Sequence, residues 1–236
     1  YPTIQAAIDA ATDGDRIEIA AGSYLESLEI DALNLTIAAA SGKTRLAPAM
    51  GDALTIEDSV VELSGLTITP SSGQGLVLTD ADVVLSDATI EGASGSLGGG
   101  VSMEGGTLSL VDVGLVDNIA TYGADLYATD DADVTLTRVD SSGGSASWGG
   151  SLYIDDATLS LSDVTISDSI VSYGGGMVLI DAIVSATDVT ISDIAATYAA
   201  GVIWVEDSIL DAVELSIADV VGNRTYGGGV YALGST

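Results

Sequence analysis

The most regular feature of the chain is a short segment in which aliphatic and polar residues alternate. In most copies it reads aliphatic-x-aliphatic-x-acid-aliphatic-x-aliphatic, and the copies begin at residues 61, 83, 108, 134, 159, 184 and 210. Successive copies start 22 to 26 residues apart. A near-constant period in this range is typical of a solenoid, in which every turn of the chain stacks on the turn before it.

One period indicates how each turn should fold. Between residues 149 and 173 the alternation predicts three short strands, at 152–154, 159–161 and 164–166, with a longer loop after them. Equivalent strands of neighbouring turns would pair in parallel, about 4.8 Å apart. The sequence therefore predicts an all-β protein: a right-handed parallel β-helix with three short strands per rung and about eight to nine rungs. The expected hand is the general one of parallel crossovers.

The first residues follow a different pattern. Thr3 is a suitable N-cap, and residues 12–14 would end a helix. Apolar residues lie between them at helical spacing, namely Ile4, Ala7, Ile8 and Ala11. A solenoid must cover the open end of its core. We therefore expect a capping helix within residues 1–14 and a single β-helix domain over 15–236, as a piece of a longer polypeptide.

Composition narrows the function classes. The 236 residues are 47% hydrophobic and carry 35 Asp and Glu against 5 Lys and Arg, a net charge of −30. This charge disfavours nucleic acid and anionic membranes, and it favours divalent cations, high salt or a cationic partner. Without Cys or His, disulfides, Ser–His–Asp and Cys–His mechanisms and most zinc sites are excluded. No apolar run is long enough to predict a membrane span.

Acidic residues recur at three corners of each predicted turn. Stacking would place them in columns, with neighbouring carboxylates about 4.8 Å apart. Repulsion between such carboxylates is relieved in one of three ways. The side chains point apart into solvent, salt screens their charges, or calcium, which favours hard oxygen ligands, bridges them. Aspartate is also common in tight turns for conformational reasons alone. The calcium candidates are Asp130, Asp131, Asp155, Asp156, Asp163 and Asp188.

Two further features are candidate sites. Arg138 interrupts one acidic column, between Asp112 and Asp163. It is either a catalytic base or a compensating charge between neighbouring rungs, and we adopt the second interpretation. Aromatic residues at outward positions could stack on sugars, although packing between rungs would place them there equally. These ligand-binding candidates are Tyr127, Tyr153 and Trp204.

An aromatic residue followed by small residues recurs before the first strand of a turn, as in SYGGGM (172–177). We interpret this motif as a corner of the repeat and not as a ligand site. Because Ala replaces two of the glycines at 199–200, small size is the expected requirement there, without positive φ. The aromatic residues are predicted to stack on their equivalents, which are Tyr122, Trp148, Tyr173, Tyr198 and Tyr226.

The segment PTIQAAIDAATDGDRIEIAAGSY (2–24) resembles the opening of right-handed β-helix proteins of the pectin-lyase-like superfamily. Later turns resemble polymorphic outer-membrane protein and autotransporter-passenger repeats. They share a Gly-Gly-x-aliphatic motif, at 98–101, 149–152, 174–177 and 227–230. The companion aromatic-x-x-Asn motif survives only in part, as LVDN (115–118). The resemblance implies a secreted protein at a bacterial cell surface.

The same resemblance introduces enzymatic functions, because the superfamily includes polysaccharide lyases, hydrolases and esterases. Its lyases typically use an Arg or Lys base beside calcium held by Asp, which would make Arg138 the base here. Its hydrolases use clustered Asp with a nearby His, and this chain has no His.

We therefore expect an extracellular β-helix segment with a structural or adhesive role and no enzymatic activity: a cell-surface stalk, passenger or surface-layer component. Calcium would stabilise it if the acidic columns bind the ion. Its expected partner is an unidentified surface protein or glycan, with end-to-end or lateral self-association. The alternative is a polysaccharide-binding or lyase-like β-helix. A groove beside Arg138 lined by Asp and aromatic residues would favour that alternative.

Overall fold

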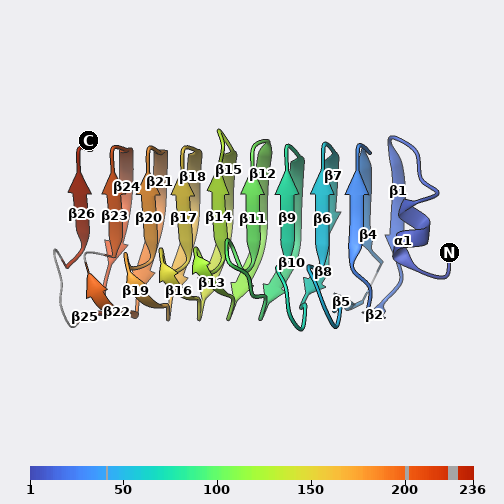
Figure 1. Cartoon of the computed structure of the whole chain (residues 1–236), viewed down its shortest axis with the longest axis horizontal. Helices are drawn as coiled ribbons and strands as arrows, with labels where there is room; N and C mark the ends of the chain where they lie inside the picture. The colour runs from blue at the N-terminus through green and yellow to red at the C-terminus, as the bar shows by residue number, and fades with distance from the viewer. Residues whose placement is uncertain (41, 200–201, 223–227) are drawn as a thin grey trace.

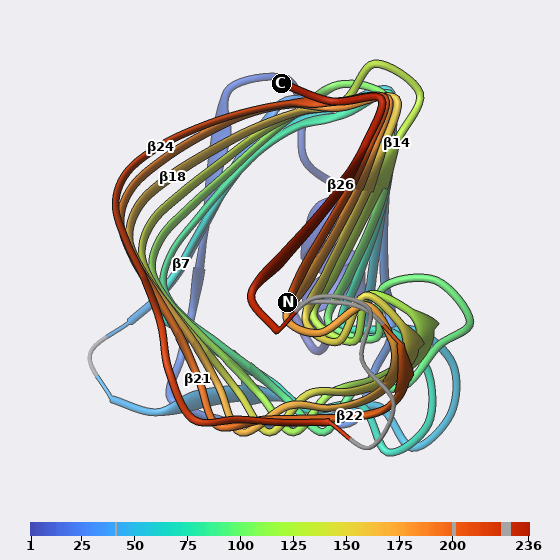
Figure 2. The same ribbon diagram turned by 90° about the vertical axis from the view of Figure 1, so that its left-hand side faces the viewer.

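The computed structural model describes residues 1–40, 42–199, 202–222 and 228–236. The chain forms a right-handed parallel β-helix of about eight turns, which lie side by side along a rod (Figure 1). Seen along the rod, equivalent strands superimpose with a gradual twist (Figure 2). The predicted fold class is confirmed, with three sheets and one short N-terminal helix among the described residues.

Three parallel sheets form the walls of the rod. Sheet B has nine strands: β3 (Leu28–Asp31), β6 (Leu54–Glu57), β9 (Leu76–Thr79), β11 (Val101–Glu104), β14 (Leu126–Thr129), β17 (Leu152–Asp155), β20 (Met177–Ile180), β23 (Ile203–Glu206) and β26 (Val230–Leu233). Sheet C has five strands: β13 (Ile119–Tyr122), β16 (Ser145–Trp148), β19 (Ile170–Tyr173), β22 (Ile194–Ala199) and β25 (Val220–Gly222).

Sheet A is the largest, with twelve strands. The strands of its early turns are short: β1 (Asp15–Ile19), β2 (Gly22–Tyr24), β4 (Leu35–Ala39), β5 (Thr44–Leu46), β7 (Val60–Ser64) and β8 (Leu66–Ile68). The strands of its later turns are long: β10 (Asp82–Glu91), β12 (Thr107–Val116), β15 (Asp133–Ser142), β18 (Thr158–Ser167), β21 (Ile183–Ser192) and β24 (Ile209–Ile217).

The long strands of sheet A bend once in the middle. The pairing of β10 with β12 skips Asp87 and Asp112, which occupy the bend. From β10 onward, the second and third strands predicted for each turn are therefore one bent strand. The third sheet, sheet C, comes from the segment that we expected to be a loop. In β19 only Val171 is buried, so the alternation was too short to predict a strand.

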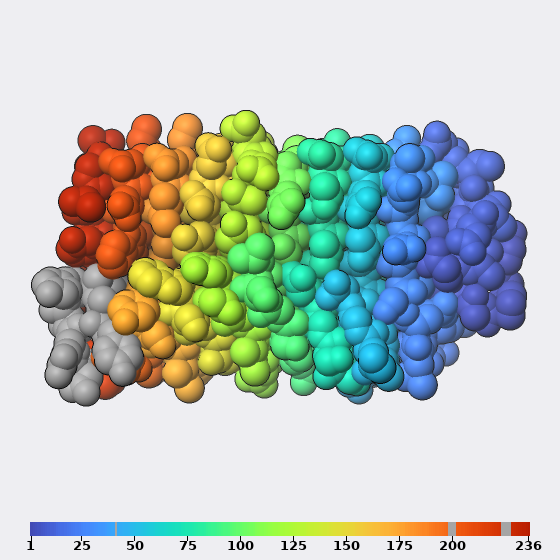
Figure 3. Space-filling view, in the orientation of Figure 1, coloured from blue at the N-terminus to red at the C-terminus, as the bar shows by residue number. Residues whose placement is uncertain are grey.

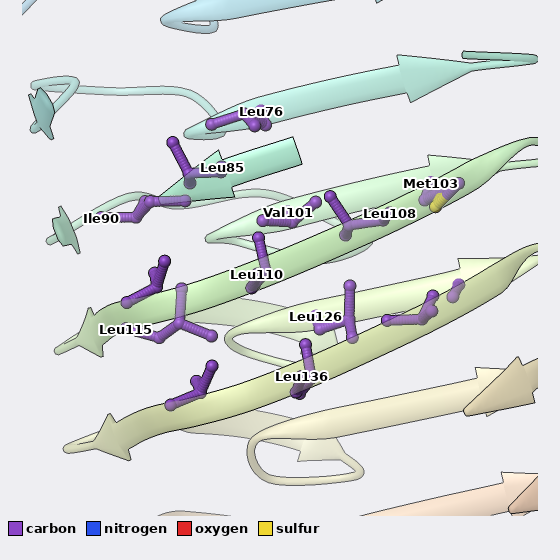
Figure 4. Packing of buried hydrophobic residues seen from close by; sticks show 14 of the residues in the cluster. Leu76, Leu85, Ile90, Val101, Met103, Leu108, Leu110, Leu115, Leu126 and Leu136 are labelled. Atoms are coloured by element: carbon purple, nitrogen blue, oxygen red, sulfur yellow. The ribbon is translucent and has the colours of Figure 1, made fainter. Parts of the chain in front are cut away.

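The interior of the rod is one continuous aliphatic core that runs through the turns. Figure 4 shows side chains of sheet B, such as Val101 and Leu126, and of sheet A, such as Leu108 and Leu136, gathered in this interior. Full burial of such a side chain contributes about 1.5–3 kcal/mol. Because every turn buries its apolar side chains against its neighbours, the stack and not the single turn is the stable unit.

The helix α1 (Ile4–Ile8) covers the N-terminal end of the core. Thr3 is the N-cap, as predicted, and its Oγ1 accepts a hydrogen bond from Ala6 N at 3.1 Å. The Glu26 carboxylate accepts two more, from Ile4 N at 2.9 Å and Gln5 N at 3.1 Å. These contacts satisfy backbone N–H groups that a helix start leaves without partners. The helix is shorter than predicted, because it ends at Ile8.

The corners of the turns are left-handed backbone positions. Of the 18 non-glycine residues with positive φ in the described part of the chain, 15 are aspartate. Aspartate tolerates this region because its short polar side chain can hydrogen-bond locally. The predicted acidic columns lie at these corners, for example Asp156 (φ 51°) between β17 and β18 and Asp163 (φ 57°) at the bend of β18. Turn chemistry therefore accounts for the placement of these aspartates.

The glycine motif also has a conformational cause. Gly149 has a φ of 57°, and a Cβ there would lie 2.8 Å from the carbonyl oxygen of Leu152. Positive φ and lack of space both require glycine, so small size alone does not explain this corner. The predictions on Ala200, Tyr226 and Gly227 lie outside the described residues, and so do those on the side chains of Tyr198 and Ala199.

Candidate functional site

Arg138 lies at the bend of β15 with a φ of 52°. Its guanidinium binds the Asp112 carboxylate of the preceding turn through two hydrogen bonds, Nε–Oδ1 at 2.6 Å and Nη2–Oδ2 at 2.8 Å. Both side chains are about half exposed. The hydrogen bond from Arg138 holds the pKa of Asp112 below its usual value. This is the geometry expected of charge compensation between neighbouring turns.

A shallow depression surrounds this ion pair on the outer face of sheet A. Its lining includes Asp87, Asp112, Arg138, Asp140, Asp163 and Thr165. These described residues supply carboxylates but no aromatic side chain. The depression therefore has the aspartates of the groove that would favour polysaccharide cleavage, but its described lining lacks the aromatic residues.

The six predicted calcium ligands lie at two different corners. The corner between sheets B and A holds Asp130, Asp131, Asp155 and Asp156, and the bend of the long sheet A strands holds Asp163 and Asp188. In the described part of the chain, no three Asp or Glu side chains form a group that could hold a metal ion. Calcium binding thus stays a prediction, without a formed site among these residues.

Carboxylates at these corners act on one another across neighbouring turns. Burial raises the pKa of Asp155, and the charges of nearby carboxylates, Asp181 first, raise it further. The pKa of Glu214 is raised by a hydrogen bond to Asp188 and by the charge of Asp188. Burial is the main cause of the shift at Asp155, and the hydrogen bond is the main cause at Glu214. Repulsion between carboxylates of neighbouring turns adds to both shifts, and dissolved salt would screen that part.

The aromatic candidates pack against one another. Tyr127 stacks on Tyr153 of the next turn, with ring centroids 5.6 Å apart and an interplanar angle of 16°. The edge of Tyr122 meets Tyr153 at 5.2 Å and 77°. Tyr153 is consequently only 9% exposed, so it does not offer a free ring face. This geometry is that of packing between turns.

A second aromatic column runs along the end of sheet C and meets the first. Trp148 stacks on Tyr173 with centroids 4.6 Å apart, as the sequence motif predicts. Trp148 also meets Trp204 of sheet B edge-on at 6.5 Å, and Trp204 contacts Tyr231 at 5.0 Å. Trp204 is half-buried, and its Nε1 donates a hydrogen bond to Glu206 Oε2 at 3.2 Å.

Sequence reasoning missed a polar cluster inside the core. We call it the Asp125 network, comprising Asn118, Asp125, Ser141, Ser151 and Ser169, all 0–1% exposed. Asn118 Nδ2 donates to Asp125 Oδ1 at 2.8 Å, and Ser141 Oγ donates to Asp125 Oδ2 at 2.6 Å. Ser151 Oγ and Ser169 Oγ lie 2.9 Å apart. No buried side-chain nitrogen or oxygen in the described residues lacks a hydrogen-bond partner.

One signal in the sequence could have revealed this network. Ser141 occupies an inward position that Leu115 and Ile166 fill in the neighbouring turns. A hydroxyl in an otherwise aliphatic column implies a buried hydrogen-bond partner. The chain positions of Asn118 and Asp125 give no comparable indication, because both lie in segments expected to be loops.

No protein-family model matches the chain, and no curated protein shows significant sequence similarity to it. The structure thus supports a parallel β-helix, while the finer resemblance to pectin-lyase-like proteins and autotransporter repeats has no support from these comparisons. Within the described residues, no helix has the length and apolar character needed to cross a membrane.

Proposed function

We propose that this chain is a structural segment of an extracellular surface protein, a rigid β-helical spacer in a stalk, passenger or surface layer. The observation that carries this proposal is the unbroken register of sheet B. Its nine strands pair in order from β3 to β26, and the described pairs contain no register shift. A solenoid built in this way holds its two ends at a fixed separation.

The surface of the rod fits this role. Figure 3 shows the turns as adjacent bands in close contact along its length. The corners carry carboxylates, which keep an apolar repeat soluble and repel other anionic surfaces. An adhesive function would use these corners and loops, with a cationic surface protein or glycan as the partner that charge favours.

Protease resistance and polysaccharide turnover together test the proposal. We expect a broad-spectrum protease to leave the folded chain intact for hours, because its backbone is paired on both sides along most of the rod. We also expect no depolymerisation of neutral or acidic polysaccharides, with or without calcium. Turnover that disappears in Arg138→Gln would contradict the proposal and establish the lyase-like alternative.

Polysaccharide binding is the second candidate function, because half-buried aromatic residues lie on the outer face of sheet B. Tyr127, Trp204 and Tyr231 are the members that keep partial exposure. A glycan array would test this function, with Trp204→Ala as the variant and Val84→Ala, on the outer face of sheet A, as the control. Glycan binding that is lost in Trp204→Ala and kept in Val84→Ala would support a sugar-binding strip. An array on which the wild type binds no glycan would contradict it.

A further inference from the structure

The members of the Asp125 network come from three successive turns inside the core: Asn118 from the turn of β12, Asp125 and Ser141 from the turn of β14 and β15, and Ser151 and Ser169 from the turn of β17 and β18. Through Asn118 the network also contacts a fourth turn. Asn118 reaches the turn before it, where its Oδ1 accepts from Ala93 N at 3.0 Å and its Nδ2 donates to the Ile90 carbonyl at 3.3 Å. The same amide donates a hydrogen bond to the Asp125 carboxyl, which belongs to the turn after that of Asn118. Ser141, from the same turn as Asp125, donates a second hydrogen bond to this carboxyl. The carboxyl of Asp125 is thus the central member of a connection that runs along the rod axis.

The neighbouring residues leave room for this carboxyl. Ser141 is smaller than the aliphatic residues above and below it in the same column. Gly144 lies on another side, where a Cβ would be 3.1 Å from Asp125 Oδ2 and 3.4 Å from Ser151 Oγ. A larger side chain at position 141, or any side chain at position 144, would occupy space that the polar cluster uses.

The surroundings of Asp125 disfavour a negative charge. Burial raises the pKa of Asp125 to about 7, although hydrogen bonds from Ser141, Asn118 and Ser151 oppose the rise. The charged residue that acts on it is Asp117, whose carboxylate raises the pKa further. The three groups that hydrogen-bond to it are neutral and cannot compensate a charge.

We propose that the Asp125 network is a proton-dependent lock across the central turns of the rod. With a proton on the Asp125 carboxyl, the network carries no charge, and the carboxyl O–H can donate to the hydroxyl of Ser141 or Ser151, since a hydroxyl accepts as well as donates. The three turns are then held together. Loss of that proton places an uncompensated negative charge in the aliphatic core, which weakens the same connection. The central turns are therefore more stable in mildly acidic than in alkaline solution.

The direction of the pH dependence follows from linkage. In the unfolded chain an aspartate titrates at about 3.9, whereas Asp125 in the folded chain titrates at about 7. Between these values the unfolded state binds fewer protons than the folded state, so stability falls as pH rises. The contribution of Asp125 is complete below pH 4, declines up to pH 7 and is constant above it.

Urea unfolding of the wild type and Asp125→Asn, measured from pH 4 to pH 8, tests the lock. The amide has the shape of the neutral carboxyl but no titration. We expect the wild-type midpoint, relative to that of Asp125→Asn, to decrease from pH 4 to pH 7 and then to level. Asp193→Asn is the matched control, since it removes an exposed carboxylate at the equivalent corner of a later turn. That carboxylate is not among the groups that shift the pKa of Asp125, so the variant should keep the wild-type dependence. A constant difference between wild type and Asp125→Asn would overturn the proposal.

Infrared spectroscopy supplies a readout that does not depend on the folding of that variant. The wild type should show the C=O band of a protonated carboxyl at pH 6, where exposed carboxylates are ionised, and lose it with a midpoint near pH 7. Ser141→Ala removes a hydrogen bond that lowers the pKa of Asp125, so it should move this midpoint to higher pH. Absence of a titrating band in the wild type would refute the lock.

Discussion

Aspartate has a conformational task at the scale of single residues. At the corners it holds a left-handed backbone that most side chains avoid, and it does so at 15 described positions. The pattern of acids along the sequence therefore predicted the corners correctly, because residue type and backbone conformation are linked there. It could not tell a solvated corner from a cation site, because both use the same residue at the same spacing.

Substitution of Asp163 separates conformation from charge. Asp163→Asn should leave the free energy of unfolding nearly unchanged, because asparagine also tolerates positive φ. Asp163→Val should lower it by about 1–2 kcal/mol, the cost of a left-handed conformation for an ordinary residue. Urea denaturation measures both values. Equal losses in the two variants would mean that the carboxylate itself, and not the backbone, is what the corner requires.

Arg138 gives a second prediction at this scale. Arg138→Gln removes the paired cation from between Asp112 and Asp163 and should lower the melting temperature in dilute buffer. The difference from wild type should shrink at 1 M NaCl, because salt screens exposed charges. A double-mutant cycle with Asp112→Asn isolates the pair. Additive effects of the two substitutions at low salt would show that the ion pair has no role in stability.

At the scale of elements, the sequence was sufficient to predict some strands and not others. Strands with two or three inward aliphatic residues were predicted, as in β17 and β18, because alternation reports directly which face is buried. Sheet C was missed, because β13 and β19 each bury one inward residue and are held mainly by pairing with their neighbours. Pairing between turns is a property of the stack, which a single repeat does not display.

The capping helix can be tested as an element. Ile8 is 3% exposed and faces the first turns of the core, so Ile8→Ala should lower the free energy of unfolding by about 2 kcal/mol. Amide hydrogen exchange should become faster in β1 and β4 and stay unchanged in β18. Leu25→Ala, at a residue that is 74% exposed, is the control. Unchanged exchange in β1 of Ile8→Ala would show that the helix does not protect the first turn.

Net charge acts at the scale of the whole molecule. The columns of carboxylates stack along a rod with a net charge of −30, so we expect the melting temperature to rise with NaCl up to 1 M, where the Debye length of about 3 Å is shorter than the spacing between turns. Calcium at matched ionic strength should give the same shift, because no three described carboxylates converge. A larger shift with calcium, lost in Asp130→Asn with Asp156→Asn, would instead establish bridging between turns.

The central claim is that one continuous, rigid coil sets a fixed distance between its turns. Because the chain has no Cys, spin labels can be placed at exposed, equivalent positions of sheet A and their separations measured by pulsed electron resonance. Val84 and Ser185 are four turns apart in register, and Glu62 and Asp211 are six turns apart. At about 4.8 Å per turn, we predict narrow distance distributions centred near about 19 Å and about 29 Å. Broad distributions, or distances that do not increase with the number of turns, would contradict the account.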